Sequence, residues 1–357
     1  MKKILILCFI LCFSIFSKAN SEKIKPLAAY KIDSLWYFID QEGKAIFNPL
    51  KLNYVSGYSE GFYKIYAESD GTRFWAFLND NGQMAVPLCD EIRYFKDDMA
   101  MIIDVVDTTS EFRLYGFVDK QGRMRVSKKY LDATDFSEGL AWVMNHNERG
   151  YINKNGNMII PWDTTGFGSE FSEGLAAMTD SLDRFGFIDH EGKVVIDFQL
   201  DEVTSFVNGY AKVNILAKWG FIDKKGKVVI EPKYDFALNF HDEFCFVGVP
   251  DTKTLNPIWG IINRGGGEVV DFKYEDIRDF NDGLGAVKEY GKWKYIDYFG
   301  NKIIDKTFEN CDSFRDGLAW AYDGENIGFI NPLGDYVVIL HKEAEVVVDL
   351  RLNKKVK

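Results

Sequence analysis

The sequence predicts an all-β fold made of about nine tandem units, each a three-stranded antiparallel meander. Three observations carry this prediction. One phrase returns nine times at spacings of 34 to 40 residues, a second phrase follows most copies at a constant offset, and one strand of each unit is apolar on both faces. With 357 residues, of which 46% are hydrophobic and 15% aromatic, the chain can also build a sizeable core.

The first phrase joins a strand to a turn, as in Trp219-Gly-Phe-Ile-Asp223-Lys-Lys-Gly226. An Asp or Asn followed by two residues and a Gly fits a type I turn, in which the first side chain binds the backbone ahead and the Gly is left-handed. A β-rich segment comes next, so the turn closes a hairpin. The predicted turns run from Asp40 to Gly43, Asn79 to Gly82, Asp119 to Gly122, Asn153 to Gly156, Asp189 to Gly192, Asp223 to Gly226, Asn263 to Gly266, Asp297 to Gly300 and Asn331 to Gly334.

The second phrase is an aromatic residue followed by any residue, an acid and Gly, or a close variant. It predicts another tight turn about 21 residues after the start of each of the first eight copies. A short strand such as 210–213 follows this turn and leads into the next unit. The eight copies occupy residues 58–61, 95–98, 136–139, 171–174, 206–209, 240–243, 280–283 and 314–317.

The strand before each Asp or Asn turn has no polar face. Its third position holds Phe, Tyr or Ile and its fourth holds Ile, Leu or Val in all nine copies. A strand buried on both sides needs a layer packed against each side. Small sheets stacked face to face provide this, either in a propeller-like toroid or in an open β-solenoid.

The repeat resembles the WG-repeat family of bacterial exported proteins, named for a Trp-Gly pair that stands here at Trp219-Gly220 and Trp259-Gly260. The resemblance covers the chain from about Leu27 to Leu340 and implies a scaffold without a common reaction. We expect the units that depart from the pattern to fold alike and to pack less uniformly. Other residues replace the Trp at Tyr115, Arg149, Phe185 and Ile327, and the Gly at Tyr37, Ala76 and Lys294.

The N-terminus has the pattern of a cleaved secretory signal. Lys2 and Lys3 precede an apolar run over residues 4–16, which is too short to span a bilayer, and small residues follow. We therefore expect a signal peptide at 1–19, the repeat array at 20–340, and a C-terminal tail at 341–357 that can add a final strand. The mature protein is expected to be exported, to the periplasm, cell surface or medium, with no transmembrane segment after cleavage.

The chain is acidic, with 54 Asp and Glu against 43 Lys and Arg. Nucleic acid is therefore not an expected partner, because phosphate binding needs a basic surface. Beyond the leader the cysteines are Cys89, Cys245 and Cys311, far apart in sequence. We expect buried thiols rather than a disulfide framework.

No residue pattern predicts a catalytic site, a metal site or a cofactor. Turns account for the regularly spaced acids, whereas glycoside hydrolysis needs two carboxylates that converge on one cleft. Phosphate-loop and dinucleotide motifs are absent, so we expect a protein that is not an enzyme. The four histidines lack the spacing of metal ligands: His146, His190, His241 and His341.

One strand position suggests a ligand-binding patch. Because this position tolerates Lys, it is expected to face water, and its Trp residues would be exposed aromatics that meet a ligand, another chain or a covering loop. His146 and Arg149 follow one of them across the next turn. The candidate ligand-binding residues are therefore Trp142, His146, Arg149 and Trp320, with local packing of an imperfect unit as the competing interpretation.

Three units are enlarged in the same class of loop, around residues 68–74, 104–114 and 250–258. Equivalent loops of a repeat array share an edge, where such proteins bind, although loops also change length without function. The sequence therefore predicts an exported, non-catalytic scaffold that binds a protein, an extracellular polysaccharide or peptidoglycan. A glycan or cell-wall binding module is the first alternative, and a glycoside hydrolase-like enzyme is the second.

Overall fold

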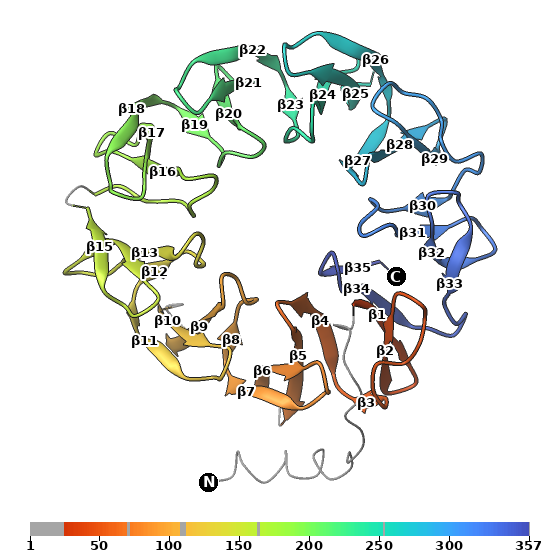
Figure 1. The fold of residues 1–357 in the computed structure, drawn as a ribbon, viewed down its shortest axis with the longest axis horizontal. Coiled ribbons are helices and arrows are strands. Elements are labelled where there is room, and N and C mark those ends of the chain that lie inside the picture. The colour runs from red at the N-terminus through yellow and green to blue at the C-terminus, as the bar shows by residue number, and fades with distance from the viewer. Residues whose placement is uncertain (1–24, 70–71, 108–111, 163–164, 253, 357) are drawn as a thin grey trace. The chain divides into compact units, whose positions relative to one another are not determined.

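The computed structural model describes residues 25–69, 72–107, 112–162, 165–252 and 254–356. The regular elements of this part of the chain are β-strands, which form nine antiparallel sheets (Figure 1). Its secondary structure includes no helix long and apolar enough to cross a membrane. The expected signal peptide lies outside the described residues.

The described part of the chain divides into two compact units: residues 25–94 with 120–122 and 343–356, and residues 95–119 with 123–342. The strands of the first unit are β1 Pro26–Ile32, β2 Leu35–Asp40, β3 Leu50–Lys51, β4 Tyr54–Ser59, β5 Phe62–Ser69, β6 Thr72–Asn79, β7 Met84–Cys89, β8 Glu91–Ile92, β34 Val346–Asp349 and β35 Lys354–Lys355. Those of the second are β9 Met99–Asp107, β10 Phe112–Asp119, β11 Met124–Tyr130, β12 Asp132–Ala133, β13 Leu140–Met144, β14 Arg149–Asn153, β15 Met158–Pro161, β16 Ala176–Thr179, β17 Phe185–Ile188, β18 Val194–Leu200, β19 Glu202–Val203, β20 Tyr210–Ile215, β21 Lys218–Asp223, β22 Val228–Tyr234, β23 Phe236–Ala237, β24 Phe244–Pro250, β25 Pro257–Asn263, β26 Glu268–Tyr274, β27 Asp276–Asn281, β28 Leu284–Glu289, β29 Lys292–Ile296, β30 Asn310–Cys311, β31 Ala319–Tyr322, β32 Ile327–Ile330 and β33 Tyr336–Ile339.

In the first unit, the two ends of the chain share one sheet. Strand β1 lies between β2 and β34, in the order β3-β2-β1-β34-β35, and the tail therefore contributes two strands. Each of the other eight sheets is built from consecutive strands. This connectivity is that of a β-propeller with nine blades rather than of an open solenoid.

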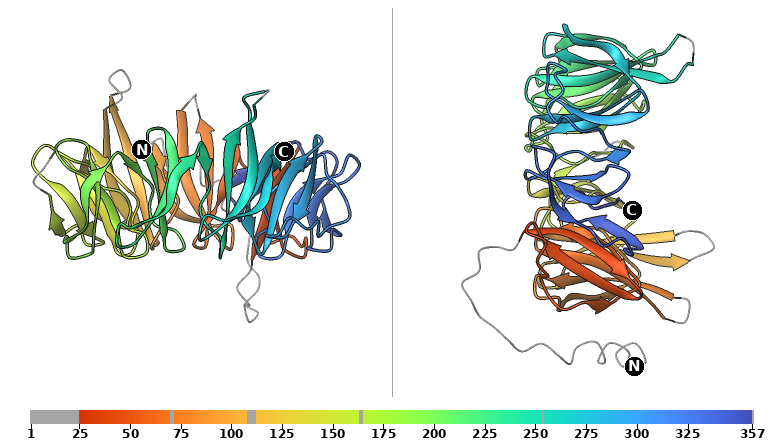
Figure 2. Two further views of the ribbon diagram at one scale, coloured as in Figure 1. Left: turned by 90° about the horizontal axis from the view of Figure 1, so that it is seen from above. Right: turned by 90° about the vertical axis from the view of Figure 1, so that its right-hand side faces the viewer.

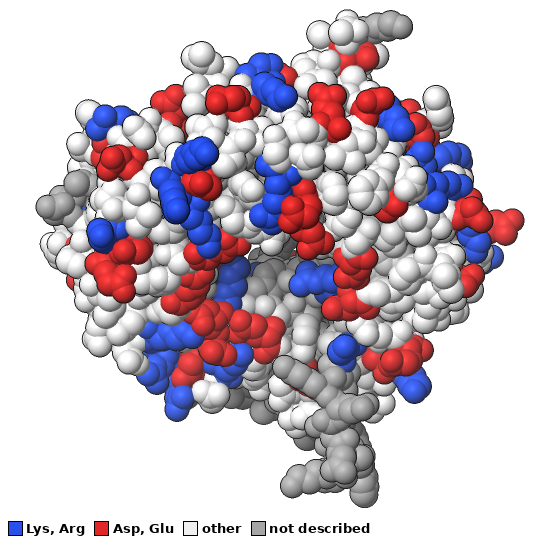
Figure 3. Space-filling view, turned by 45° about the horizontal axis from the view of Figure 1, so that its top comes forward, with Lys and Arg blue, Asp and Glu red and all other residues white. Residues whose placement is uncertain are grey.

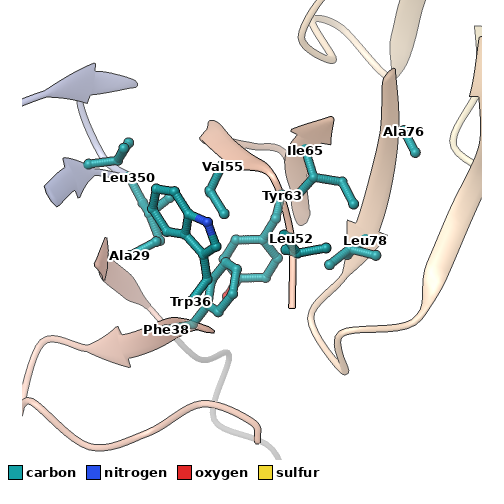
Figure 4. Packing of buried hydrophobic residues seen from close by; sticks show 11 residues of the cluster. Ala29, Trp36, Phe38, Leu52, Val55, Tyr63, Ile65, Ala76, Leu78 and Leu350 are labelled. Atoms are coloured by element: carbon teal, nitrogen blue, oxygen red, sulfur yellow. The ribbon is translucent and has the colours of Figure 1, made fainter. Parts of the chain in front are cut away.

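The core of the first unit is aromatic. Trp36 and Phe38 of β2 lie beside Tyr63 of β5, and Leu350 completes the cluster from the C-terminal segment (Figure 4). The rings of Phe38 and Tyr63 meet edge to face, with centroids 5.1 Å apart. The C-terminal segment is thus part of the core rather than a free tail.

Blade β19–β22 shows the common plan in the second unit. Its strands pair in chain order, with Val213 opposite Gly220 and Trp219 opposite Tyr234. The three expected strands are present, and a two-residue first strand, β19, is added. The grouping differs from the expected unit, because the strand after each second phrase pairs with the first-phrase strand that follows it. Blades of this plan therefore begin at the strand before a second phrase.

The expected Asp and Asn turns are confirmed. Asp223 Oδ1 accepts hydrogen bonds from the backbone nitrogens of Lys225 and Lys227, at 2.9 and 3.0 Å. Asp40, Asp119, Asp189 and Asp297 accept equivalent bonds. Nine turn glycines have φ between 72° and 82°: Gly43, Gly82, Gly122, Gly156, Gly192, Gly226, Gly266, Gly300 and Gly334.

The two apolar faces of the central strand serve two different cores. In β21, Phe221 packs with Ile230 and with Ile262 of the following blade. Its neighbour Ile222 packs instead with Phe187 of the preceding blade. Successive side chains of a strand point to opposite faces, so one strand joins both neighbours. Blades of the second unit are therefore stacked face to face, as the sequence predicted.

The Gly of the Trp-Gly pair makes room for the outer strand. A Cβ added at Gly220 would lie 2.5 Å from the carbonyl oxygen of Ile230 in β22. Glycines at 116, 150, 186, 260 and 328 face equivalent carbonyls. Where Lys294 replaces this Gly, the sheet is β27-β28-β29 and has no regular outer strand; where Tyr37 replaces it, the outer strand β3 has two residues. The expectation that these two units fold like the others is wrong in this respect.

Candidate binding surface

Every blade has two chemically different ends. The Asp or Asn turn and the second-phrase turn lie at one end, which we call the turn end. The hairpin between the two long inner strands, such as β20–β21, lies at the other, which we call the hairpin end. All three enlarged loops occur in hairpins of this second kind, β5–β6, β9–β10 and β24–β25.

The second-phrase turns are tight and strained. In the turn before β20, Asn208 and Gly209 have φ of 52° and 87°, and the backbones of Val207 and Tyr210 exchange two hydrogen bonds. This is the type I′ geometry that suits a two-residue hairpin. Acidic residues hold the first central position, with φ of 50–55°, at Glu60, Asp97, Glu138, Glu173, Asp242, Asp282 and Asp316.

These acids link consecutive blades of the second unit. Glu173 Oε2 accepts a hydrogen bond from the Gly209 amide of the next blade at 3.0 Å, and it pairs with Lys224 Nζ of that blade at 3.1 Å. Burial opposes ionisation of Glu173, but the bonds from Lys224 and Gly209 outweigh it and lower its pKa. The same amide bond runs from Gly139 to Asp97, from Gly174 to Glu138 and from Gly317 to Asp282.

Side chains beside these acids extend the network. Ser137 and Ser172 each donate to the carbonyl of the next second-phrase Phe, at 2.7 Å. His241 Nε2 lies 3.1 Å from Asp279 Oδ2, and this hydrogen bond raises the pKa of His241 against the opposing effect of burial. In Figure 3, Lys and Arg alternate with Asp and Glu over the face in view. The turn end is thus occupied by contacts that hold blades together.

The hairpin end of four consecutive blades instead presents apolar side chains to solvent. Leu216 and Tyr290 are each 91% exposed, Leu255 is 78% exposed and Leu182 is 69% exposed. They stand in hairpins β20–β21, β28–β29, β24–β25 and β16–β17. The hairpins on either side, β13–β14 and β31–β32, carry polar tips instead, 145–148 and 323–326. Exposed large apolar side chains that recur on neighbouring blades make this end the candidate binding surface.

Backbone strain accompanies this exposure. Leu216, Leu255 and Tyr290 have φ of 51°, 61° and 52°. Left-handed backbone favours Gly, Asn or Asp, and a large apolar residue there costs stability while its side chain gains nothing from burial. The stability of the fold therefore does not explain why large apolar residues occupy these tips.

Two aromatic side chains border the tips. Phe167 is exposed and its carbonyl accepts from the amide of Thr179, at the hairpin end of β16. Phe236 opens β23 and lies opposite Gly248, two residues before the end of β24. Both rings therefore lie toward the hairpin end of the blades that carry Leu182 and Leu255.

The expected exposure of Trp142 and Trp320 is wrong. Trp142 is 1% exposed and Trp320 is 4% exposed. The Trp142 ring packs edge to face on Tyr151, with centroids 5.4 Å apart, inside a core shared with the next blade. Neither indole can contact a ligand at the surface.

The strand position itself faces the next blade, which explains both the Trp and the Lys found there. A Cβ on Gly168 of the next blade would lie 2.7 Å from the Trp142 ring, so the missing side chain makes room for the indole. Lys212, at the equivalent position, reaches the next blade with its stem and donates Nζ to the Ala237 carbonyl at 3.0 Å. Tolerance for Lys thus reflects snorkelling rather than open solvent.

The other two candidate residues remain near the surface. His146 is exposed at the tip of hairpin β13–β14, and Arg149 is half-buried at the start of β14. The structure does not bring either of them together with an exposed indole. His146 and Arg149 therefore stay candidates without a defined site.

Among the described residues, no group of three or more His, Cys, Asp or Glu side chains could hold a metal ion. Cys245 and Cys311 are buried free thiols and Cys89 is a half-buried one. Burial raises the pKa of the Cys245 thiol. This thiol is correspondingly unreactive.

The tip residues were missed by the sequence analysis. Their signal is an apolar residue between the two inner strands, where other copies hold Asn, Asp or Gly. Comparing Leu216 with the aligned residues His146 and Gly324 would have shown it.

Nine similar blades with one constant end and one variable end define a repeat propeller, which changes its loops on a fixed core. The family model of the WG containing repeat matches the chain over residues 75–102, 115–148, 150–179, 185–219, 219–249, 259–293 and 295–325. The chain belongs to this WG containing repeat family. No curated protein matches the sequence.

Solved structures support the fold. A crystal structure described as the eukaryotic initiation factor is 10% identical, with a TM-score of 0.62 over 90% of this chain and 97% of that chain. BamB from Moraxella catarrhalis is 14% identical, with a TM-score of 0.45 over 82% of this chain and 96% of that chain. At these identities the first likeness supports the fold alone, and the second, below 0.5, adds no argument.

Proposed function

We propose that this protein is an exported, non-catalytic scaffold that binds another protein through the hairpin end of the four blades between β16 and β29. The observation that carries the proposal is the row of exposed apolar tips Leu182, Leu216, Leu255 and Tyr290, of which the last three stand on left-handed backbone. Export is supported by the leader pattern of residues 1–19.

The chemistry of the row favours a protein over a glycan. Three of the four tips are Leu, which offers no flat ring for a sugar to stack on. Protein interfaces bury aliphatic and aromatic side chains in a core surrounded by polar residues, as the tips and their polar flanks provide. A glycan-binding module is the second candidate, favoured by the exposed rings of Tyr290 and Phe167.

The test uses a polar variant of the tips. Asn tolerates left-handed backbone, so Leu216→Asn, Leu255→Asn and Tyr290→Asn are combined with Leu182→Ser. The matched control is Phe299→Ser with Leu333→Ser, since these apolar residues are 65% and 80% exposed at the turn end. Both variants carry a photocrosslinking residue at position 218 and are expressed in cells.

Crosslinking to a discrete protein in the control, and its loss in the tip variant, is the expected result. Equal crosslinking in both variants contradicts the proposal. Purified protein is also screened against polysaccharides. Glycan binding that the tip variant loses, without any protein adduct, supports the second candidate instead.

A further inference from the structure

The enlarged hairpin β24–β25 differs from its neighbours in length and in the chemistry of one face. Its seven-residue strands pair from Phe244 opposite Asn263 to Pro250 opposite Pro257. The equivalent hairpin β20–β21 ends in the two-residue tip 216–217. Figure 2 shows β24–β25 projecting beyond the end of its own blade.

One face of this hairpin is apolar from blade to tip. Opposite residues of an antiparallel ladder share a face, and so do residues two apart along a strand. Phe236, Gly248 and Trp259 stand opposite one another on three adjacent strands. Pro250 and Pro257 continue the same face, and Leu255 follows at the tip.

Because Gly248 has no side chain, the rings of Phe236 and Trp259 can approach each other. A Cβ there would lie 3.2 Å from Phe236 Cβ and 3.2 Å from the Trp259 ring. The rings of Phe236 and Trp259 instead approach each other over the glycine, with centroids 5.8 Å apart. Phe236 and Leu255 are exposed, and Trp259 is half-buried.

We infer that this strip, made of Phe236, Trp259, Pro250, Pro257 and Leu255, is the anchor of the interface and takes an extended segment of a partner protein through its aliphatic or proline side chains. The inference rests on the proposed function and names the part of the surface that supplies most of the affinity. Aromatic residues on rigid strands lose little entropy on binding, and two opposed prolines stiffen the arm.

The composition of the strip decides between classes of partner. It carries no charged side chain, so it offers nothing to a phosphate headgroup or a charged polymer. A sugar site needs several polar groups that fix the hydroxyls, and the strip offers only the indole N–H of Trp259. Aliphatic and proline side chains of a partner protein need neither a charged group nor a polar group to bind. They pack well against aromatic rings and prolines.

The experiment combines a shortened hairpin with point variants. Replacing residues 250–257 by Asn-Gly gives the length of hairpin β20–β21 and keeps the pair Val249–Ile258. Phe236→Ser removes one ring of the strip, and Gly248→Ala pushes the two rings apart without removing either. Leu216→Asn, outside the strip, is the matched control.

The probe is a photocrosslinking phenylalanine analogue in place of Phe236, and the captured protein is identified by mass spectrometry and purified. Its affinity for each variant is then measured by calorimetry, with melting curves to confirm folding. We expect at least about a tenfold loss of affinity for the shortened hairpin and for Phe236→Ser, and a smaller loss for Leu216→Asn.

Affinity within twofold of the parent for the shortened hairpin would overturn the inference. If the four-tip variant still loses binding in that case, the proposed function stands and the anchor lies elsewhere along the row. If neither the shortened hairpin nor the four-tip variant loses binding, both the inference and the proposed function fail. Binding of polysaccharides or of phosphatidylcholine vesicles that depends on Phe236, without any protein adduct, also overturns the inference.

Discussion

The two ends of the blades follow different rules, although one repeated sequence builds both. At the turn end, four acids of the second phrase accept a hydrogen bond from the next blade, as Glu173 does from Gly209. At the hairpin end, Leu216 and Tyr290 project into solvent from strained backbone. The repeat therefore conserves contacts where blades must join and varies residues where they need not.

The largest effect is expected inside the stack. Trp142→Ala removes a fully buried indole that fills the space above Gly168, and it should lower the free energy of unfolding by about 3–5 kcal/mol. Leu216→Ala, at an exposed tip, should change it by less than about 0.5 kcal/mol. Urea unfolding of both variants checks the contrast. Similar losses of unfolding free energy in the two variants would contradict the distinction between a folding role for Trp142 and none for Leu216.

The next effect concerns the Gly that admits the outer strand. Gly220→Val places a Cβ 2.5 Å from the Ile230 carbonyl oxygen, which is too close. It should therefore cost about 1–3 kcal/mol and expose the amides of β22 to hydrogen exchange. Blade β27–β29 is the natural counterpart, because Lys294 stands there. In Lys294→Gly, residues 302–308 should exchange more slowly. Unchanged exchange in both variants would show that this Gly does not control the strand.

A smaller, pH-dependent effect is expected at the turn end. The pKa of His241 is raised above 6.5 by its hydrogen bond to Asp279, with Asp242 also nearby. The protonated form is therefore favoured in the folded state. Its stabilisation is fully present below pH 6.5 and is lost as pH rises through the higher folded pKa.

The check is the difference in melting temperature between the parent and His241→Gln. This difference should be larger at pH 5.5 than at pH 8.5. A difference that does not change with pH would mean that the charge of His241 contributes nothing to the link between the two blades.

The smallest effect on stability belongs to the hairpin end. Leu216→Asn puts a residue that tolerates φ of 51° at the tip, so stability should be unchanged or should rise by up to about 1 kcal/mol. Thermal melts measure this. A clear loss would show that Leu216 has a folding role and weaken the contrast between the ends.

Local signals were readable from the sequence, and non-local ones were not. The Asp223 turn and its Gly226 depend on four consecutive residues, so the hairpins were predicted correctly. Strand grouping depends on pairing between segments, and the blade frame was therefore misassigned by one strand. The propeller was one of two open options until β34 was seen beside β1.

The candidate site failed for the same reason. Burial of Trp142 depends on Gly168, 26 residues away, and on the stacking of two blades. Periodicity alone cannot show that a variable position faces another sheet. The exposed tips were missed because an apolar residue in a short loop has no periodic pattern, yet the enlarged loop at 250–258 was recognised and now forms part of the proposed surface.

The central claim is that the apolar tips contribute to binding and not to folding. The most direct test is the four-tip variant, Leu182→Ser with Leu216→Asn, Leu255→Asn and Tyr290→Asn, measured by urea unfolding beside the crosslinking assay. The account predicts a free energy of unfolding within about 1 kcal/mol of the parent together with loss of the protein adduct. A loss of several kcal/mol, or an undiminished adduct in a stable variant, would contradict it.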